Sequence, residues 1–154
     1  MAVSDLAELA FEQSQRRLDK QEGVLEELRA RTAILLAASS LAASFLGKEA
    51  FQGSGWDPLA VLAGAAFLVT MLSAVYVLLP RKRFVFSVIG SAMYEQLYGL
   101  ELEEVHRRLA YDLDRFWEQN DGEIAKLRGG VQLAAGGLTV EVLALVALVA
   151  DTIT

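Results

Sequence analysis

The chain has 154 residues, of which 54% are hydrophobic, and it carries no cysteine and a net charge of −6. The absence of cysteine excludes disulfides, thiol catalysis and thiolate metal sites. The acidic balance lacks the concentrated basic face that general DNA binding needs. The length is too short for a membrane domain and a separate enzyme domain, so we expect one compact all-α membrane protein.

Basic side chains are distributed unevenly around three apolar stretches, Thr32–Gly47, Leu59–Leu79 and Val131–Ala150. Of the 14 Lys and Arg residues, only Lys48 lies between the first two stretches, and none follows the third. Because cytoplasmic loops retain Lys and Arg, we predict three transmembrane helices with a cytosolic N-terminus and an outside C-terminus. Residues 1–31 hold no apolar core, so the first stretch itself is expected to direct insertion.

The N-terminal arm, residues 1–31, is predicted to form a cytosolic amphipathic helix. Large apolar side chains recur there at heptad-like spacing, at Phe11, Leu18, Leu25 and Leu28. Ser14 and Gln21 interrupt that seam where a strict coiled coil is apolar, so we expect the arm to pack on its neighbours. We interpret it as an oligomerisation or gating arm that continues into the first span, because no helix breaker separates the two.

Residues 32–79 are predicted to form a transmembrane hairpin. The first stretch spans only about 24 Å at ~1.5 Å per residue, against a hydrocarbon core of ~30 Å. It is therefore plausible inside a bundle and marginal alone, with Arg31 extending its reach by snorkelling. Leu59–Leu79 is long enough, and Trp56 in the connecting turn suits the outer interface.

The segment 80–129 is predicted to be cytosolic and helical. Residues 84–99 are apolar but too short and broken for a span, which favours an interfacial helix. A charged helix follows, with one apolar face that we expect to pack against the N-terminal arm, formed by Leu102, Val105, Leu109, Leu113 and Phe116. The tract Gln119–Gly122 is expected to bend the chain before the third span.

The third span, within residues 130–154, carries a carboxylate at its centre. One narrow face of small and polar residues holds the candidate pore-lining residues Gly130, Ala134, Gly137, Glu141 and Ala144. Copies of this helix around an axis would form a carboxylate ring that favours cations. Two alternatives stay open: Glu141 hydrogen-bonds a Ser or Thr of a neighbouring span, or it lies nearer the outer interface.

Two basic clusters are candidate contacts for ligand phosphates or anionic lipids: Arg81, Lys82, Arg83, Arg107 and Arg108. The first three also suffice as a topology anchor, and the acidic residues around the last two, Glu101, Glu103 and Glu104, favour a salt-bridged solvated face. The single histidine, His106, lacks a nucleophile or companion ligands. We therefore predict no enzymatic activity, no metal and no cofactor.

The order of these features resembles the Pycsar-type transmembrane effectors and SLATT domains of prokaryotic conflict systems. The resemblance runs from about Leu25 to the end of the chain. It lies in the basic start of span one (Leu28–Ala38), the end of span two (Leu78–Arg81), the aromatic Phe84–Phe86, and the later Tyr94-Glu95, Asn120 and Lys126-Leu127. It implies a bacterial inner-membrane protein that senses a cyclic nucleotide or short oligonucleotide made during phage infection and then permeabilises the membrane.

Three spans in one subunit do not enclose a useful conducting path, so a pore requires a homo-oligomer, for which we take a tetramer. The leading hypothesis is accordingly a nucleotide-opened pore that kills or arrests an infected cell. A second is a membrane-anchored interaction module that recruits or restrains a cytosolic partner. A third is a transporter subunit that uses Glu141 for proton coupling. Unlike relatives with an appended sensor domain, this chain would bind any ligand on its spans, cytosolic helices or subunit interfaces.

Overall fold

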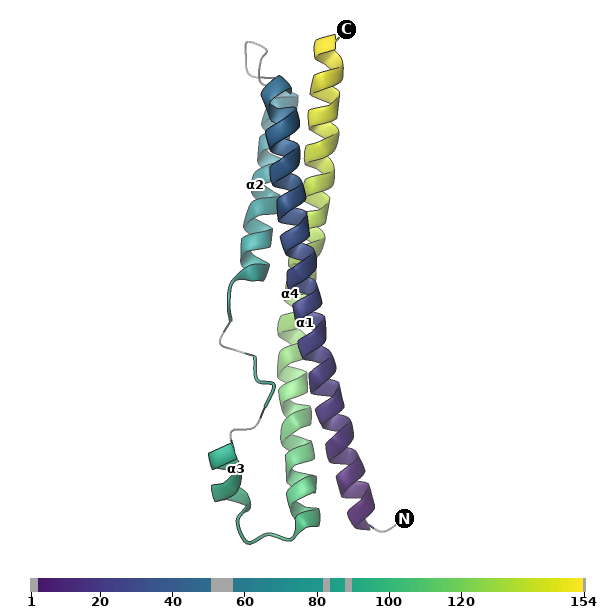
Figure 1. Ribbon diagram of the computed structural model, residues 1–154, viewed down its shortest axis with the longest axis vertical. Coiled ribbons are helices and arrows are strands. Elements are labelled where there is room, and N and C mark those ends of the chain that lie inside the picture. Colours follow the sequence, from purple (N-terminus) through teal and green to yellow (C-terminus); the bar gives the residue numbers. More distant parts are fainter. Residues whose placement is uncertain (1–2, 51–56, 82–83, 88–89, 154) are drawn as a thin grey trace. The chain divides into compact units, whose positions relative to one another are not determined.

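The computed structural model describes residues 3–50, 57–81, 84–87 and 90–153, and these residues form helices with no strand. The helices are α1 (Val3–Ala50), α2 (Pro58–Leu78), α3 (Gly90–Leu97) and α4 (Leu102–Ile153) (Figure 1). The prediction of an all-α protein is confirmed.

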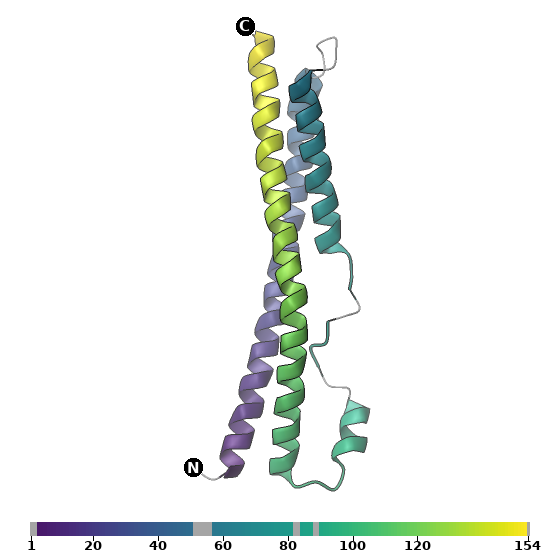
Figure 2. The same ribbon diagram turned by 180° about the vertical axis from the view of Figure 1, so that it is seen from behind.

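The chain divides into two compact units, to both of which α1 and α4 contribute. Unit 1 comprises Met1–Glu26 and Arg81–Ala125, and unit 2 comprises Glu27–Pro80 and Lys126–Thr154. Within unit 2, α1 and α4 run in the same direction and α2 runs opposite to both (Figures 1 and 2). The N-terminal arm does continue into the first apolar stretch as one helix, as predicted.

The expected bend at Gln119–Gly122 is absent, because α4 continues through this tract without interruption. Asn120 is buried and directs its side chain toward the neighbouring segment instead of ending its own helix. Gly122 costs the helix roughly 1 kcal/mol relative to alanine, which is too little to break it between strong helix formers.

The helical segment expected at 84–99 is shorter than predicted. Residues 84–87 are not helical, and α3 occupies only Gly90–Leu97. The Asn120 amide explains the extended backbone, because its Nδ2 donates to the Val85 carbonyl at 2.9 Å and its Oδ1 accepts from the Val85 amide at 3.2 Å. After α3, Gly99 turns the chain with a positive φ of 84°, a conformation that glycine adopts without steric cost.

Helix α2 has clear start and stop signals. The Asp57 side chain accepts a hydrogen bond from the Leu59 amide at 2.8 Å, and Pro58 occupies the first turn, where its missing amide hydrogen costs nothing. The helix ends at Leu78, two residues before Pro80, which lacks the amide hydrogen needed to continue it.

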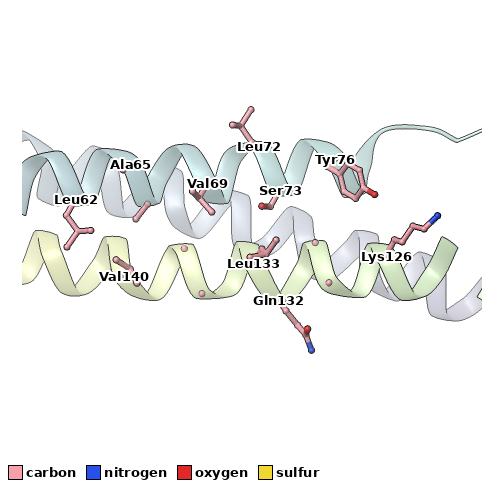
Figure 3. Close-up of a pocket in the computed structure, with 15 residues that line it drawn as sticks. Leu62, Ala65, Val69, Leu72, Ser73, Tyr76, Lys126, Gln132, Leu133 and Val140 are labelled. Carbon is pink, nitrogen blue, oxygen red and sulfur yellow. The ribbon is translucent and has the colours of Figure 1, made fainter. Parts of the chain in front are cut away.

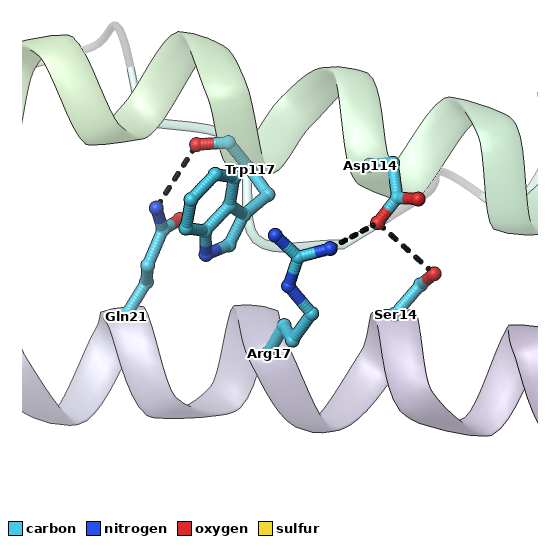
Figure 4. A network of polar contacts seen from close by, with 5 residues as sticks. All are labelled: Ser14, Arg17, Gln21, Asp114 and Trp117. Atoms are coloured by element: carbon cyan, nitrogen blue, oxygen red, sulfur yellow. Dashed lines mark hydrogen bonds and ion pairs between the residues drawn. The ribbon is translucent and has the colours of Figure 1, made fainter.

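Unit 1 confirms that the arm packs against the N-terminal part of α4. Leu18 and Leu25 of α1 and Leu109 and Leu113 of α4 are buried. The two polar residues that interrupt the seam are buried as well. Figure 4 shows why they are tolerated: Ser14 donates to Asp114 Oδ1 at 3.1 Å, and Gln21 Nε2 donates to the Trp117 carbonyl at 2.9 Å. Hydrogen bonds thus replace apolar contacts at these positions.

Unit 2 is packed with small residues. Its buried side chains are mainly alanine, serine and threonine, including Ala63, Ala66, Ser39, Thr70, Ala74 and Ala134. Many of its large apolar side chains point outward, with Ile34 68%, Leu72 68% and Leu133 62% exposed, whereas Leu127, Leu145 and Leu148 are buried. So much exposed apolar surface is unusual for a water-soluble protein.

The packing of unit 1 yields a stability prediction. We expect Leu18→Ala to lower the free energy of unfolding by about 2–5 kcal/mol, because it leaves a cavity under a fully covered side chain. The control Leu9→Ala, at a half-exposed position of the same helix, should change it by less than about 0.5 kcal/mol. Equal losses in chemical denaturation of the two variants would contradict this packing.

Candidate functional site

Among the residues that the structure describes, two helices are long and apolar enough to cross a membrane, judged by length and composition. They are α2, with a mean hydropathy of 2.3 over its best window, and α4, with 2.2. Only 28% of the window in α2 and 33% of that in α4 is buried. A core helix of a water-soluble protein would be mostly covered, so the exposed apolar surface of these helices fits lipid better than water. The first predicted stretch, Thr32–Gly47, is not among the helices that meet this test.

Glu141 lies inside unit 2, on the apolar part of α4. Its side chain is 1% exposed, and its Oε2 accepts a hydrogen bond of 2.5 Å from Ser39 Oγ of α1, itself fully buried. Its other oxygen, Oε1, is buried without a hydrogen-bond partner among the described residues. The alternative that Glu141 bonds a serine of a neighbouring apolar helix is therefore confirmed as far as the hydrogen bond goes.

The predicted small-residue face of α4 exists, and it faces the other helices of unit 2. All of its members are buried or closely packed: Gly130, Ala134, Gly137, Glu141 and Ala144. A Cβ atom at Gly130 would lie 2.8 Å from Val77 Cγ2, and one at Gly137 would collide with Thr70 Oγ1. These glycines allow α2 and α4 to approach closely. In this arrangement the face is packed in the interior of unit 2 and does not line an open path.

A groove of about 1120 Å³ lies between α2 and α4, beside their close contact (Figure 3). Its lining includes Gly130 and Gly137 together with the adjacent Gly129 and Gly136, and large side chains such as Leu72 and Leu133. Tyr76 and Lys126 lie at one end of it (Figure 3). Sequence reasoning missed this groove, although the two Gly-Gly pairs at 129–130 and 136–137 were its visible signal.

The basic clusters are engaged with acidic side chains. Arg81 pairs with Glu123 at 2.8 Å, and both side chains are largely buried in unit 1. Arg107 and Arg108 both pair with Glu104, the latter through Nε at 2.7 Å, so the salt-bridged face is confirmed there. The hydrogen bond from Arg108, with the positive charges of both arginines, holds the pKa of Glu104 below its usual value. Lys82 and Arg83 lie outside the described residues.

The arm residues lie inside the protomer. Phe11 stacks on His106 with ring centroids 5.4 Å apart, and Leu18 and Leu25 are covered within unit 1. Leu28 is buried in unit 2. None of the three leucines is surface available to a second copy. Among the described residues, no group of three His, Asp or Glu side chains is arranged to hold a metal ion.

No protein-family model, curated protein or solved structure matches the chain.

The Ser39–Glu141 contact can be tested with an adjacent control. Ser39→Ala removes the donor and leaves a buried carboxyl with no partner, so we expect a loss of about 1–3 kcal/mol in stability. Ser40→Ala should be nearly neutral, because the exposed Ser40 hydroxyl only donates to the Leu36 carbonyl of its own helix. Unfolding of both variants in detergent micelles measures the difference. A neutral Ser39→Ala would show that the bond contributes nothing.

Proposed function

We propose that the chain is an integral membrane protein with three spans, formed by α2, the C-terminal part of α4 and the second half of α1. The support is the outward placement of many large apolar side chains on all three helices around a core rich in small residues. On α1 the outward residues include Ile34, Leu41 and Phe45. Although this stretch is short, packing against two longer helices can stabilise it across the membrane. The uneven Lys and Arg distribution supports a cytosolic N-terminus.

We further propose that the protein self-associates into a cation-conducting pore, with the tetramer as the working assembly. The observation that carries this proposal is Glu141, an ionisable side chain buried within an apolar helix, with one carboxyl oxygen unpaired. Ionisable groups at membrane depth are costly and usually belong to ion or proton pathways. A merely structural hydrogen bond to Ser39 could be made by a neutral residue at lower cost.

The described arrangement corresponds to a closed state in this proposal. The carboxyl of Glu141 is covered by α1 on the Ser39 side, and α2 packs on the same face of α4 at Gly130 and Gly137. Conduction requires water to reach the carboxyl, and the simplest way is a movement of α1 that separates Ser39 from Glu141. The hydrogen bond between them then acts as the latch of the closed pore.

The opening signal in this proposal is a nucleotide second messenger, and the outcome is depolarisation of a bacterial inner membrane during phage infection. The support for both is the resemblance of the sequence to Pycsar-type and SLATT effectors, which covers the chain from about Leu25 onward. The buried Glu141 is the support for the pore, and the resemblance is the support for the nucleotide signal.

Ion flux through reconstituted protein tests the role of Glu141. In proteoliposomes, Glu141→Gln should lower the permeability ratio of cations to anions severalfold, because it removes the fixed negative charge while keeping the size of the side chain. Glu118→Gln, which changes an exposed acid in unit 1 on the same helix, should leave the ratio unchanged. Unchanged selectivity in Glu141→Gln would remove this residue from the pathway. Absence of flux in the unmodified protein under every stimulus would overturn the pore.

One observation favours the second function, a membrane-anchored interaction module. Unit 1 has an open groove of about 470 Å³ between its two long helices, lined in part by Leu6, Ala10 and Tyr111. Leu6 and Tyr111 are well exposed. Exposed apolar side chains on a part of the chain outside the spans are typical of partner contacts.

Substitution on this groove separates the two functions better than truncation, because deleting residues 1–24 would uncover Leu109 and Leu113. For an interaction module, Leu6→Glu with Tyr111→Glu should abolish growth arrest in cells, whereas a pore should retain both growth arrest and flux in proteoliposomes. Growth arrest and flux that both persist would exclude a partner at this groove. The matched control Glu8→Gln changes an exposed residue that does not line it.

A further inference from the structure

The four glycines at 129–130 and 136–137 of α4 differ in how closely the neighbouring helix approaches them. Gly130 and Gly137 are needed for the contact with α2, because a Cβ atom at either position would meet Val77 or Thr70 at close range. At Gly129 and Gly136, by contrast, an added Cβ would meet no atom within 4 Å. Neither has a positive φ, so nothing in the protomer itself calls for glycine at these two positions.

A glycine inside a helix costs roughly 0.5–1 kcal/mol relative to alanine, so two such residues without a role in the protomer need another reason. They lie seven residues apart, two helical turns, and both line the groove between α2 and α4. In membranes, glycines at such spacing let the backbone of another helix approach closely. The groove therefore has the features of a packing surface for a helix from outside the protomer.

The second half of α1 offers a matching ridge. The small residues Ala33, Ala37, Ser40 and Ser44 are exposed in the protomer. Beside them, Ile34, Leu41 and Phe45 stand out at 68%, 58% and 74% exposure. The protomer thus leaves uncovered both an apolar ridge at three- and four-residue spacing and a groove with a small-residue floor. No residue of α1 lines that groove.

The ridge and the groove lie at the same height within unit 2. The hydrogen bond between Ser39 of α1 and Glu141 of α4 shows that these two residues lie at the same height. The two helices also run in the same direction (Figures 1 and 2). Counting five residues back on each helix places Ile34 level with Gly136. Copies inserted in the same direction stand side by side in a membrane, so Ile34 of one copy can meet Gly136 of the next without a vertical shift.

We propose that the exposed ridge of α1, at Ile34, Ala37 and Leu41, docks into the α2–α4 groove of a second copy of this chain. The two surfaces are different parts of the protomer, so the contact is head-to-tail and repeats until a ring closes. This interface rests on the proposed self-association in a membrane and specifies which surfaces form it.

The largely apolar lining of the groove agrees with this occupant, because the part of α1 from Thr32 to Phe45 carries no charged side chain.

Disulfide cross-linking in native-like membranes tests the interface, and the chain suits it because it has no cysteine of its own. Ile34→Cys and Gly136→Cys are made as separate variants, and an added Cβ at Gly136 meets open space. We expect a cross-linked dimer only when the two variants are mixed before oxidation. The double variant should give a ladder of higher oligomers. Leu68→Cys, an exposed position of α2 outside the groove, mixed with Ile34→Cys is the control and should not cross-link.

The two glycines of one pair provide a second test. An added Cβ at Gly136 meets no atom within 4 Å, and the rest of a leucine side chain would occupy the groove, so for Gly136→Leu we expect intact helical content and loss of the oligomer in native mass spectrometry of nanodiscs. Gly137→Leu collides with Thr70 and should instead lower the stability of the protomer itself. An oligomer that persists in Gly136→Leu would overturn the proposed interface.

The outcomes distinguish failure of this interface from failure of the pore. If the unmodified protein is a monomer in nanodiscs, both the proposed pore and the proposed interface are wrong. If it is an oligomer that conducts but cross-links only within one variant, Ile34 to Ile34 or Gly136 to Gly136, the contact is two-fold and the head-to-tail interface alone is wrong. A phospholipid that co-purifies with each subunit, without Ile34–Gly136 cross-links, would assign the groove to lipid and also overturn the interface.

Discussion

The close contact between α2 and α4 is the constraint on which unit 2 depends. It is possible only because Gly130 and Gly137 present no side chain to Val77 and Thr70. Lipid gives helices no hydrophobic reason to associate, so close backbone packing and buried hydrogen bonds must supply the attraction. Thr70 shows both effects, since its hydroxyl donates to the Ala66 carbonyl of its own helix at 3.0 Å and approaches the Ala134 carbonyl of α4 at 3.4 Å.

Once α2 occupies that face, the remaining surfaces of α4 are determined by the helical period. The preceding residues, Gly129 and Gly136, are rotated by about 100° from this contact and line the groove beside it. Glu141 lies one turn beyond Gly137 on the packed side, where α1 supplies Ser39. A single close contact thus directs the carboxylate inward and the spare glycines outward. The carboxylate and the spare glycines therefore serve different tasks, although they lie within a few residues of one another.

The sequence predicted the helices well where their signals are local. Heptad spacing predicted that α1 packs on α4 in unit 1, and the polar pattern around Glu104 predicted its salt bridges. It failed at Asn120, whose turn-like neighbourhood suggested a bend. That residue satisfies the backbone of Val85, which is distant in sequence. The glycine pairs were also ambiguous, because the face that each residue presents depends on where α2 packs. Such long-range contacts leave no mark in a local pattern.

The proposed latch and the proposed interface meet on one helix. Ser39 faces the interior of the protomer, while Ile34 and Leu41, five residues before it and two after it, face outward. Because α1 is a continuous helix, a movement that separates Ser39 from Glu141 also shifts Ile34 and Leu41 against the neighbouring copy. Opening of one subunit would therefore disturb its contact with the next, unless that copy moves as well. A closed ring of such contacts favours a concerted transition, because a ring that contains both open and closed subunits has interfaces that fit poorly.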